Sequence, residues 1–73
     1  METNTFELRG EYIELCNLLK LAGIANSGGQ GKLMVSDGIV KVDGNVETRR
    51  TAKIRAGQVV ECLSETIKVV AAV

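Results

Sequence analysis

The spacing of hydrophobic residues changes near the middle of the chain, at Gly38. Before that residue, apolar side chains recur every three or four positions, as they do on one face of a helix. After it they alternate with polar side chains, as in strands that are buried on one face only. A chain whose helices precede its strands is expected to belong to the α+β class. We therefore predict two N-terminal helices packed on a small antiparallel β-sheet.

The first helix is predicted over residues 11–22, where Gly23 ends it, and the second over residues 28–37. Ser27 is a good N-cap for the second helix. Glu11 and Glu14 are expected in the first turn of the first helix, where the helix dipole favours acids. The residues expected to face inward are Tyr12, Leu15, Cys16, Leu18, Leu19 and Ala22 in the first helix and Gly31, Met34 and Val35 in the second.

Strand signals surround these helices. The dipeptide Asp43-Gly44 is typical of a two-residue hairpin turn, and a second turn is predicted at Ser64-Glu65. A short edge strand, which contains Phe6, is expected before the helices, and Phe6 is assigned to the core. The strands predicted are residues 5–8, 39–42, 46–48, 59–63 and 66–70.

The length of the chain limits what it can do. Its 73 residues are enough for a single domain, which we assign to residues 1–73 with a core over about residues 6–70. A chain of this size buries only about 60% of the surface that its unfolded form exposes, so a deep active-site cleft is not expected. Cys16 and Cys62 are predicted to be reduced thiols packed in the core. Because neither a signal peptide nor a membrane span is evident, we expect a cytoplasmic protein. We also expect it to be a monomer.

The side chains needed for catalysis are scarce. The sequence has no histidine, the usual general acid–base at neutral pH. Two separated cysteines without histidine argue against zinc, and Ser27 and Ser36 have no evident base beside them. Glu11 and Glu14 are interpreted as a solvated helix face rather than a catalytic pair. We expect no enzymatic activity, no catalytic residue, no metal and no cofactor.

Charge is distributed unevenly along a chain whose net charge is zero. Residues 1–19 carry a charge of −3, residues 20–55 a charge of +4 and residues 56–73 a charge of −1. Such a basic middle is a candidate footprint for a polyanion. We expect five of its cations to converge on one face of the fold, namely Lys20, Lys32, Arg49, Arg50 and Lys53.

Two segments of the basic middle could hold an anion. In Ser27-Gly28-Gly29-Gln30-Gly31-Lys32, the N–H groups at the start of the second helix are open to a phosphate; the alternative is an ordinary glycine-rich turn between helices. The second segment, residues 49–55, would turn Ile54 to the core and place Lys53 and Arg55 on the outer face. Its alternative is a solvated loop.

An ordered series of segments then points to a family. These segments are Leu18-Leu19-Lys20-Leu21-Ala22-Gly23, Ser27-Gly28-Gly29-Gln30-Gly31-Lys32, Asp37-Gly38-Ile39-Val40-Lys41-Val42-Asp43-Gly44, Glu47-Thr48-Arg49-Arg50-Thr51-Ala52-Lys53-Ile54 and Gly57-Gln58-Val59-Val60. Together they resemble the S-four RNA-binding domain, named after the fourth protein of the small ribosomal subunit, over about residues 6–70. The chain is most similar to the small, stand-alone bacterial members that associate with ribosomes.

The resemblance implies the alpha-L motif, in which two helices pack on a small sheet and RNA is held by the second helix and a basic loop. By position, the helix-start contacts fall on Ser27, Gly29, Gln30 and Lys32. The basic loop falls on Arg49, Arg50 and Lys53, with Lys20, Lys41 and Arg55 as flanking candidates. Many members have arginine where this chain has Gly28, and alanine where it has Gly31.

The expected partner is structured RNA, most of all ribosomal RNA, with the ribosome or an RNA-processing enzyme as a further partner. Because Phe6 and Tyr12 are assigned to the core, we expect recognition by shape, without bases stacked on aromatic side chains. Two other functions stay open. The basic loop could serve a protein-interaction adaptor that meets an acidic partner, or the chain could be a vestigial enzyme.

Overall fold

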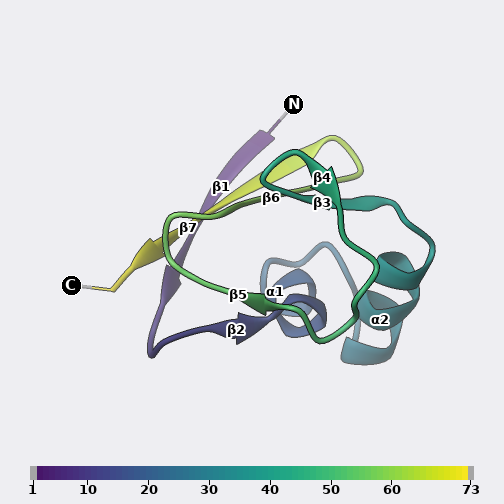
Figure 1. Cartoon of the computed structure of the whole chain (residues 1–73), viewed down its shortest axis with the longest axis horizontal. Helices are drawn as coiled ribbons and strands as arrows, with labels where there is room; N and C mark the ends of the chain where they lie inside the picture. Colours follow the sequence, from purple (N-terminus) through teal and green to yellow (C-terminus); the bar gives the residue numbers. More distant parts are fainter. Residues whose placement is uncertain (1, 73) are drawn as a thin grey trace.

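The computed structural model describes residues 2–72. It confirms an α+β fold, in which the two helices lie together at one end, below the sheet (Figure 1). Two details of the prediction were wrong, because a second, unpredicted strand lies between the edge strand and the first helix and because the sheet is mixed rather than antiparallel. The elements are β1 (Glu2–Leu8), β2 (Ile13–Glu14), α1 (Leu15–Leu21), α2 (Gly28–Ser36), β3 (Val40–Val42), β4 (Asn45–Val46), β5 (Lys53–Ile54), β6 (Val59–Cys62) and β7 (Glu65–Ala71).

The main sheet has the strand order β1-β7-β6-β3-β4. Its antiparallel part is the predicted pair of hairpins, while β1 lies parallel to β7 along its whole length, with Phe6 opposite Val69. The expected edge strand at residues 5–8 is therefore confirmed, and it is longer than predicted. Parallel pairing is possible because both helices and five strands separate β1 from β7 along the chain, which leaves ample length for the crossover.

A two-residue pair of strands replaces the predicted beginning of the first helix. Ile13 pairs with Ile54 and Glu14 with Lys53, so β2 and β5 form a second, small antiparallel sheet. Glu14 is the extended N-cap residue of α1, with φ −69° and ψ 140°. The prediction that Glu11 and Glu14 lie in the first helical turn was wrong. Residues 13 and 14 pair with β5 as a strand, and the helix begins only at Leu15.

The two helices touch at Gly31, which packs on the backbone of α1. A Cβ atom added at Gly31 would lie 2.7 Å from the carbonyl oxygen of Cys16. Gly31 faces inward as predicted, and its lack of a side chain lets the two helices approach closely. The helix α1 ends as predicted at Gly23, where the N–H groups of Gly23 and Ile24 donate to the carbonyls of Lys20 and Leu19, a pattern that satisfies the last turn.

The core lies between the helices and the inner face of the sheet. Cys16 and Cys62 are buried free thiols, as predicted. Neither helix within residues 2–72 is long and apolar enough to cross a membrane. The largest side chains that are fully buried are Leu15, Leu18, Leu19, Ile54 and Ile67, followed by Val35, Val40, Val60 and Val69.

The two hairpin turns differ in how well the sequence predicts them. Asp43 and Gly44 both have positive φ, 52° and 86°, and form the predicted two-residue turn between β3 and β4. The turn between β6 and β7 consists of Leu63 and Ser64, with φ 51° and 67°, and not of Ser64-Glu65 as predicted. The prediction was wrong by one residue because neither Leu nor Ser is favoured at positive φ.

Candidate nucleic-acid interface

The basic loop, residues 47–53, is fastened to the start of α1. The N–H of Leu15 donates to the carbonyl of Ala52 over 2.9 Å, and the N–H of Cys16 donates to the carbonyl of Arg50 over 3.2 Å. These N–H groups belong to the first turn of a helix, where they have no partner within the helix. The loop therefore caps α1 with its backbone, while buried Ala52 and Ile54 hold it to the core.

Glu47 fixes the conformation of this loop through Arg49. Its carboxylate accepts hydrogen bonds from the backbone N–H, Nε and Nη2 of Arg49, each over 3.0 Å. The bonds from the Arg49 side chain and backbone lower the pKa of Glu47 to about 2. The Arg49 guanidinium is consequently paired with an acid of its own loop, although its side chain remains 79% exposed.

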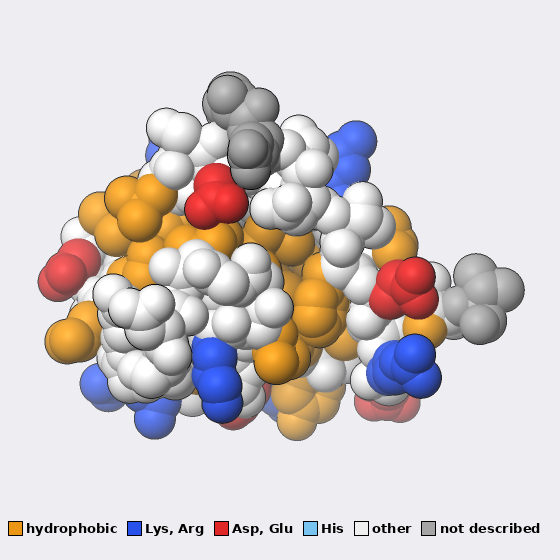
Figure 2. Space-filling view, turned by 180° about the vertical axis from the view of Figure 1, so that it is seen from behind, with side chains coloured by type: hydrophobic (Ala, Val, Ile, Leu, Met, Phe, Trp, Pro, Cys, Tyr) orange, Lys and Arg blue, Asp and Glu red, His pale blue; other side chains and the backbone are white. Residues whose placement is uncertain are grey.

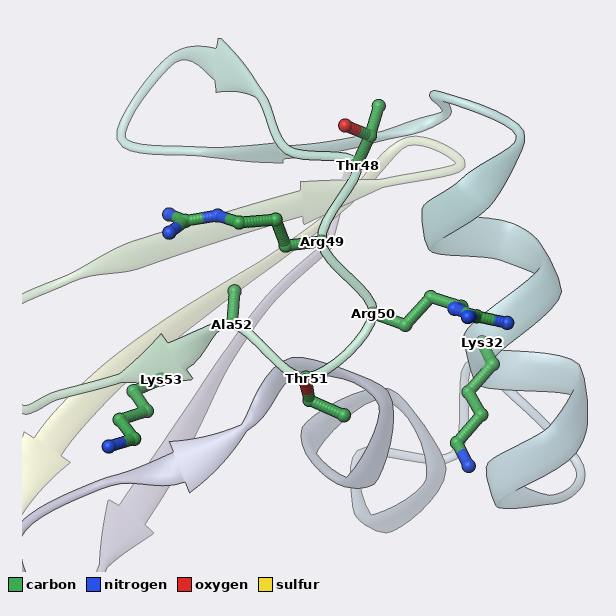
Figure 3. A pocket seen from close by; sticks show the side chains of 7 residues that line it. All are labelled: Lys32, Thr48, Arg49, Arg50, Thr51, Ala52 and Lys53. Carbon is green, nitrogen blue, oxygen red and sulfur yellow. The ribbon is translucent and has the colours of Figure 1, made fainter.

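A hollow of about 730 Å³ lies along this loop and extends to Lys32 on α2. In Figure 3, Arg50 extends from the loop toward Lys32 on α2, whereas Arg49 and Lys53 extend to the other side of the loop. We call this surface the basic groove. Among the described residues its lining contains four cations and no carboxylate, and consists of Lys32, Thr48, Arg49, Arg50, Thr51, Ala52 and Lys53.

The start of α2 is capped as predicted. The Ser27 hydroxyl oxygen accepts the N–H of Gln30 over 3.1 Å, and the Gln30 side-chain carbonyl accepts the N–H of Asn26. Both side chains thus have a structural role, which leaves the Ser27 O–H and the Gln30 amide N–H groups as donors for a ligand. The predicted residues Ser27 and Gln30 can still take part in binding through these donors.

Gly28 and Gly29 have a different surrounding from Gly31. An added Cβ would meet its nearest atoms at ordinary contact distances, 3.9 Å from Asn17 Oδ1 for Gly28 and 3.8 Å from Ser27 Oγ for Gly29. Packing therefore does not require glycine at either position. Their N–H groups lie in the first helical turn, where no carbonyl of the helix can accept them. This arrangement suits an anion that approaches the backbone closely.

The structure brings together only part of the predicted cation cluster. Lys32, Arg49, Arg50 and Lys53 line the basic groove, whereas Lys20, exposed in the last turn of α1, is outside its lining. Lys41 lines another hollow beside Glu61 and Glu65. The view from behind likewise shows Lys and Arg side chains along the lower margin, at the helices, and others apart from them near the top and side (Figure 2).

Tyr12 is a correction to the sequence analysis. It is 42% exposed instead of buried in the core, whereas Phe6 packs against the core as expected. Lys53 Nζ lies 4.9 Å from the centroid of the Tyr12 ring, and the Arg55 guanidinium carbon lies 6.0 Å from it. The expectation that the basic surface has no aromatic side chain was therefore wrong.

A signal for Tyr12 was present in the sequence. Tyr12-Ile13-Glu14 and Lys53-Ile54-Arg55 are both triplets with an apolar centre, as expected for two short strands that pair and bury their isoleucines. In that phase, Tyr12 shares the outer face with Lys53 and Arg55. The stronger helical spacing of the residues that follow Glu14 concealed this pattern.

Known proteins resemble this chain in sequence and in fold. Residues 6–70 match the S4 domain family. YbcJ of Escherichia coli strain K12 is 50% identical over 68 residues, which are 92% of this chain and 97% of that protein, and YbcJ of Shigella flexneri has the same identity and coverage.

Solved structures agree with this result. The solution structure of Escherichia coli YbcJ, described as an alpha-L motif involved in RNA-binding, is 46% identical, covers 94% of this chain and 86% of YbcJ, and has a TM-score of 0.69. The 30S ribosomal protein S4e of Thermoplasma acidophilum has a TM-score of 0.59 at 19% identity, covers 80% of this chain and 31% of that protein, and shows likeness of fold alone. The match of most of the chain, together with its 50% identical relative, shows that the chain belongs to the S4 domain family.

Proposed function

We propose that this protein binds structured RNA, with ribosomal RNA as the expected class, and that the basic groove holds the phosphate backbone. The observation that carries the proposal is a groove lined by four cations and, among the described residues, by no carboxylate. Membership of the S4 domain family supports it. So does the similarity to YbcJ, whose structure is described as an alpha-L motif involved in RNA-binding.

The groups around the basic groove suit phosphates better than bases. Arg50 offers a planar fork of donors, and Lys32 and Lys53 offer mobile point charges. The N–H groups of Gly28 and Gly29 add uncharged donors at the positive end of α2. Contacts of this kind fix the position of a nucleic-acid backbone and carry no sequence information directly. The groove should therefore select RNA by the path of its backbone.

The remaining parts of the proposal concern the setting in which the protein works. We propose a monomeric, single-domain binding module of the cytoplasm that leaves any chemistry to its partner, either the ribosome or an RNA-processing enzyme. The small fold and its shallow surface support a role in binding. Cross-linking to RNA in cells with ultraviolet light, followed by sequencing of the attached RNA, identifies the class that is bound.

Binding of a fluorescently labelled RNA hairpin, followed by anisotropy, tests the groove. Arg50→Ala should weaken binding by tenfold or more, since it removes charge-assisted hydrogen bonds of about 1.5–3 kcal/mol. Gly29→Asp should also weaken it, because a carboxylate would occupy the place proposed for a phosphate. Lys68→Ala, which removes an exposed cation from β7, is the matched control and should bind as the wild type does.

Circular dichroism of each variant establishes that it is folded. Equal affinities for all four proteins would contradict the proposed groove. If the native complex in cells survives digestion with ribonuclease, the protein-adaptor function gains support instead.

A further inference from the structure

The ring of Tyr12 stands between two surfaces of different character. Lys53 and Arg55 lie on the outer face of β5 and its continuation, 4.9 Å and 6.0 Å from the ring centroid. Tyr12 also lines a hollow of about 400 Å³, which lies between the end of β1, the strand β2 and the last turn of α1. The other residues that line this hollow are Phe6, Glu7, Leu8, Arg9, Ile13 and Leu21.

The hollow has the size and lining of a site for a small, flat group. Pockets for small molecules occupy about 300–1,000 Å³ and are mostly apolar with a few polar groups. Leu21 is 62% exposed and Tyr12 is 42% exposed, so two large apolar side chains face solvent around one depression. Covering them with a base would remove apolar surface from water.

This hollow is linked to the basic groove through Lys53. Lys53 lines the groove, and its ammonium group lies over the Tyr12 ring. A backbone that leaves the groove at Lys53 therefore reaches the aromatic ring directly. Arg9 at the hollow and Arg55 beside the ring supply further cations. Acids also lie nearby, among them Glu7 at the hollow and Glu14 opposite Lys53 in the strand pair.

We infer that Tyr12 and this hollow bind one unpaired nucleotide of the RNA whose backbone lies in the basic groove. The base lies against the Tyr12 ring, and its flanking phosphates contact Lys53 and Arg55. The inference rests on the proposed function and adds a site to it. A nucleotide fits better than a protein side chain because the site continues the groove and has cations beside an aromatic ring. Every base has a face that can stack, so the site accepts any of the four.

The test compares two RNA hairpins of equal length, one fully paired and one with a single bulged 2-aminopurine. Wild-type protein should prefer the bulged hairpin and quench the fluorescence of 2-aminopurine when it binds. Tyr12→Ala should lose both effects, with a roughly 5- to 150-fold loss of affinity for the bulged hairpin, the range expected for loss of one stacked base. Tyr12→Phe should retain both effects.

Two further variants make the test specific. Tyr12→Leu keeps an apolar side chain without a ring and should lose the quenching while it preserves the fold. Leu63→Ala removes another exposed apolar side chain, one that lines a different hollow, and it should change nothing. The dependence of affinity on salt should be the same for Tyr12→Ala as for the wild type, because the stacked base is uncharged.

The outcomes separate this site from the groove. Absence of quenching by the wild type, or unchanged quenching and preference in folded Tyr12→Leu, overturns the nucleotide site. If Arg50→Ala still weakens both hairpins in that case, the groove stands without the site. Failure of the wild type to bind either hairpin overturns the proposed function itself.

Discussion

Two glycines near the start of α2, Gly29 and Gly31, have different roles. Gly31 lies against the α1 backbone, and an added Cβ would be 2.7 Å from the Cys16 carbonyl oxygen. At Gly29, the nearest atom to an added Cβ is 3.8 Å away. Packing thus explains why residue 31 is glycine. For Gly29 we propose that the missing side chain gives a ligand access to the N–H groups of the helix.

This difference predicts opposite effects of the same substitution. Gly31→Ala should lower the free energy of unfolding by about 1–3 kcal/mol, the usual cost of overpacking, because the helices must move apart. Gly29→Ala should leave it unchanged or raise it, because alanine favours helix more than glycine does. Urea denaturation of both variants measures the effect. Equal stability of the two would show that the helices can separate without cost.

The lowered pKa of Glu47 predicts how the stability of the fold depends on pH. Its hydrogen bonds with Arg49 hold its pKa at about 2, below the ordinary value of 4.5. A carboxylate whose pKa is lowered by folding stabilises the native state above its unfolded pKa, and this contribution is lost as pH falls toward the folded pKa. The loss should therefore occur between about pH 4.5 and pH 2.

Unfolding by urea at a series of pH values checks this expectation. The N–H of Val59 and the amide of Gln58 also hold the pKa of Asp43 below its ordinary value, so the wild-type curve contains both groups. Glu47→Gln isolates one of them. It should be less stable than the wild type at neutral pH, and the difference should shrink below pH 4.5. A difference that is constant down to pH 2 would contradict the role of the Glu47 carboxylate.

At the level of elements, the sequence predicts well those elements whose ends are set by neighbouring residues. The second helix was predicted over residues 28–37 and is found at Gly28–Ser36, because Ser27 at its start and Gly38 after its end are signals within the sequence itself. The pairing of β2 with β5 joins residues about 40 positions apart, and such a partner cannot be found from helical spacing. The parallel pairing of β1 with β7 was missed for the same reason.

The turn between β6 and β7 carries a conformational cost that can be removed. Leu63 and Ser64 have φ values of 51° and 67°, and the left-handed conformation costs roughly 1–2 kcal/mol per residue for most amino acids. Replacing the pair by Asn-Gly, the sequence that this turn favours, should raise the free energy of unfolding by about 1–2 kcal/mol. Thermal unfolding should shift upward by several degrees.

The matched control for this turn is Leu63→Ala. It removes the same exposed side chain and keeps an ordinary residue at positive φ, so it should not reproduce the gain. A gain of equal size in the control would assign the effect to the exposed leucine rather than to the backbone of the turn.

For the molecule as a whole, sequence composition predicted the basic region but not the direction of its side chains. Four of the five expected cations line one groove, since they lie on two segments that the fold brings together. Whether Arg49 is free or paired depends on the conformation of its loop, where Glu47 binds it. The exposure of Tyr12 depends on strand pairing. Composition alone therefore predicts neither the pairing of Arg49 nor the exposure of Tyr12.

The groove should neutralise fewer phosphates than the five cations expected from the sequence would, because Lys20 lies outside it and Arg49 is paired with Glu47. With Lys32, Arg50 and Lys53 available and Arg49 paired to Glu47, three to four contacts are reasonable. Using the slope of about 0.9 per contact found for duplex DNA, affinity should fall roughly 40- to 150-fold between 50 and 200 mM salt. Arg50→Ala should lower the slope by about one and weaken different RNAs alike, whereas Lys68→Ala should leave it unchanged.

A salt titration against a hairpin and an unstructured strand of equal length measures this slope. The hairpin should bind more tightly, because cations and N–H donors on a rigid loop and a helix start fit a backbone whose path is already fixed. The protein carries no net charge, so a steep slope must come from the local field of the groove rather than from the whole molecule. Tighter binding of the unstructured strand, with little effect of salt, would mean that the groove does not hold the RNA backbone and that contacts to bases dominate.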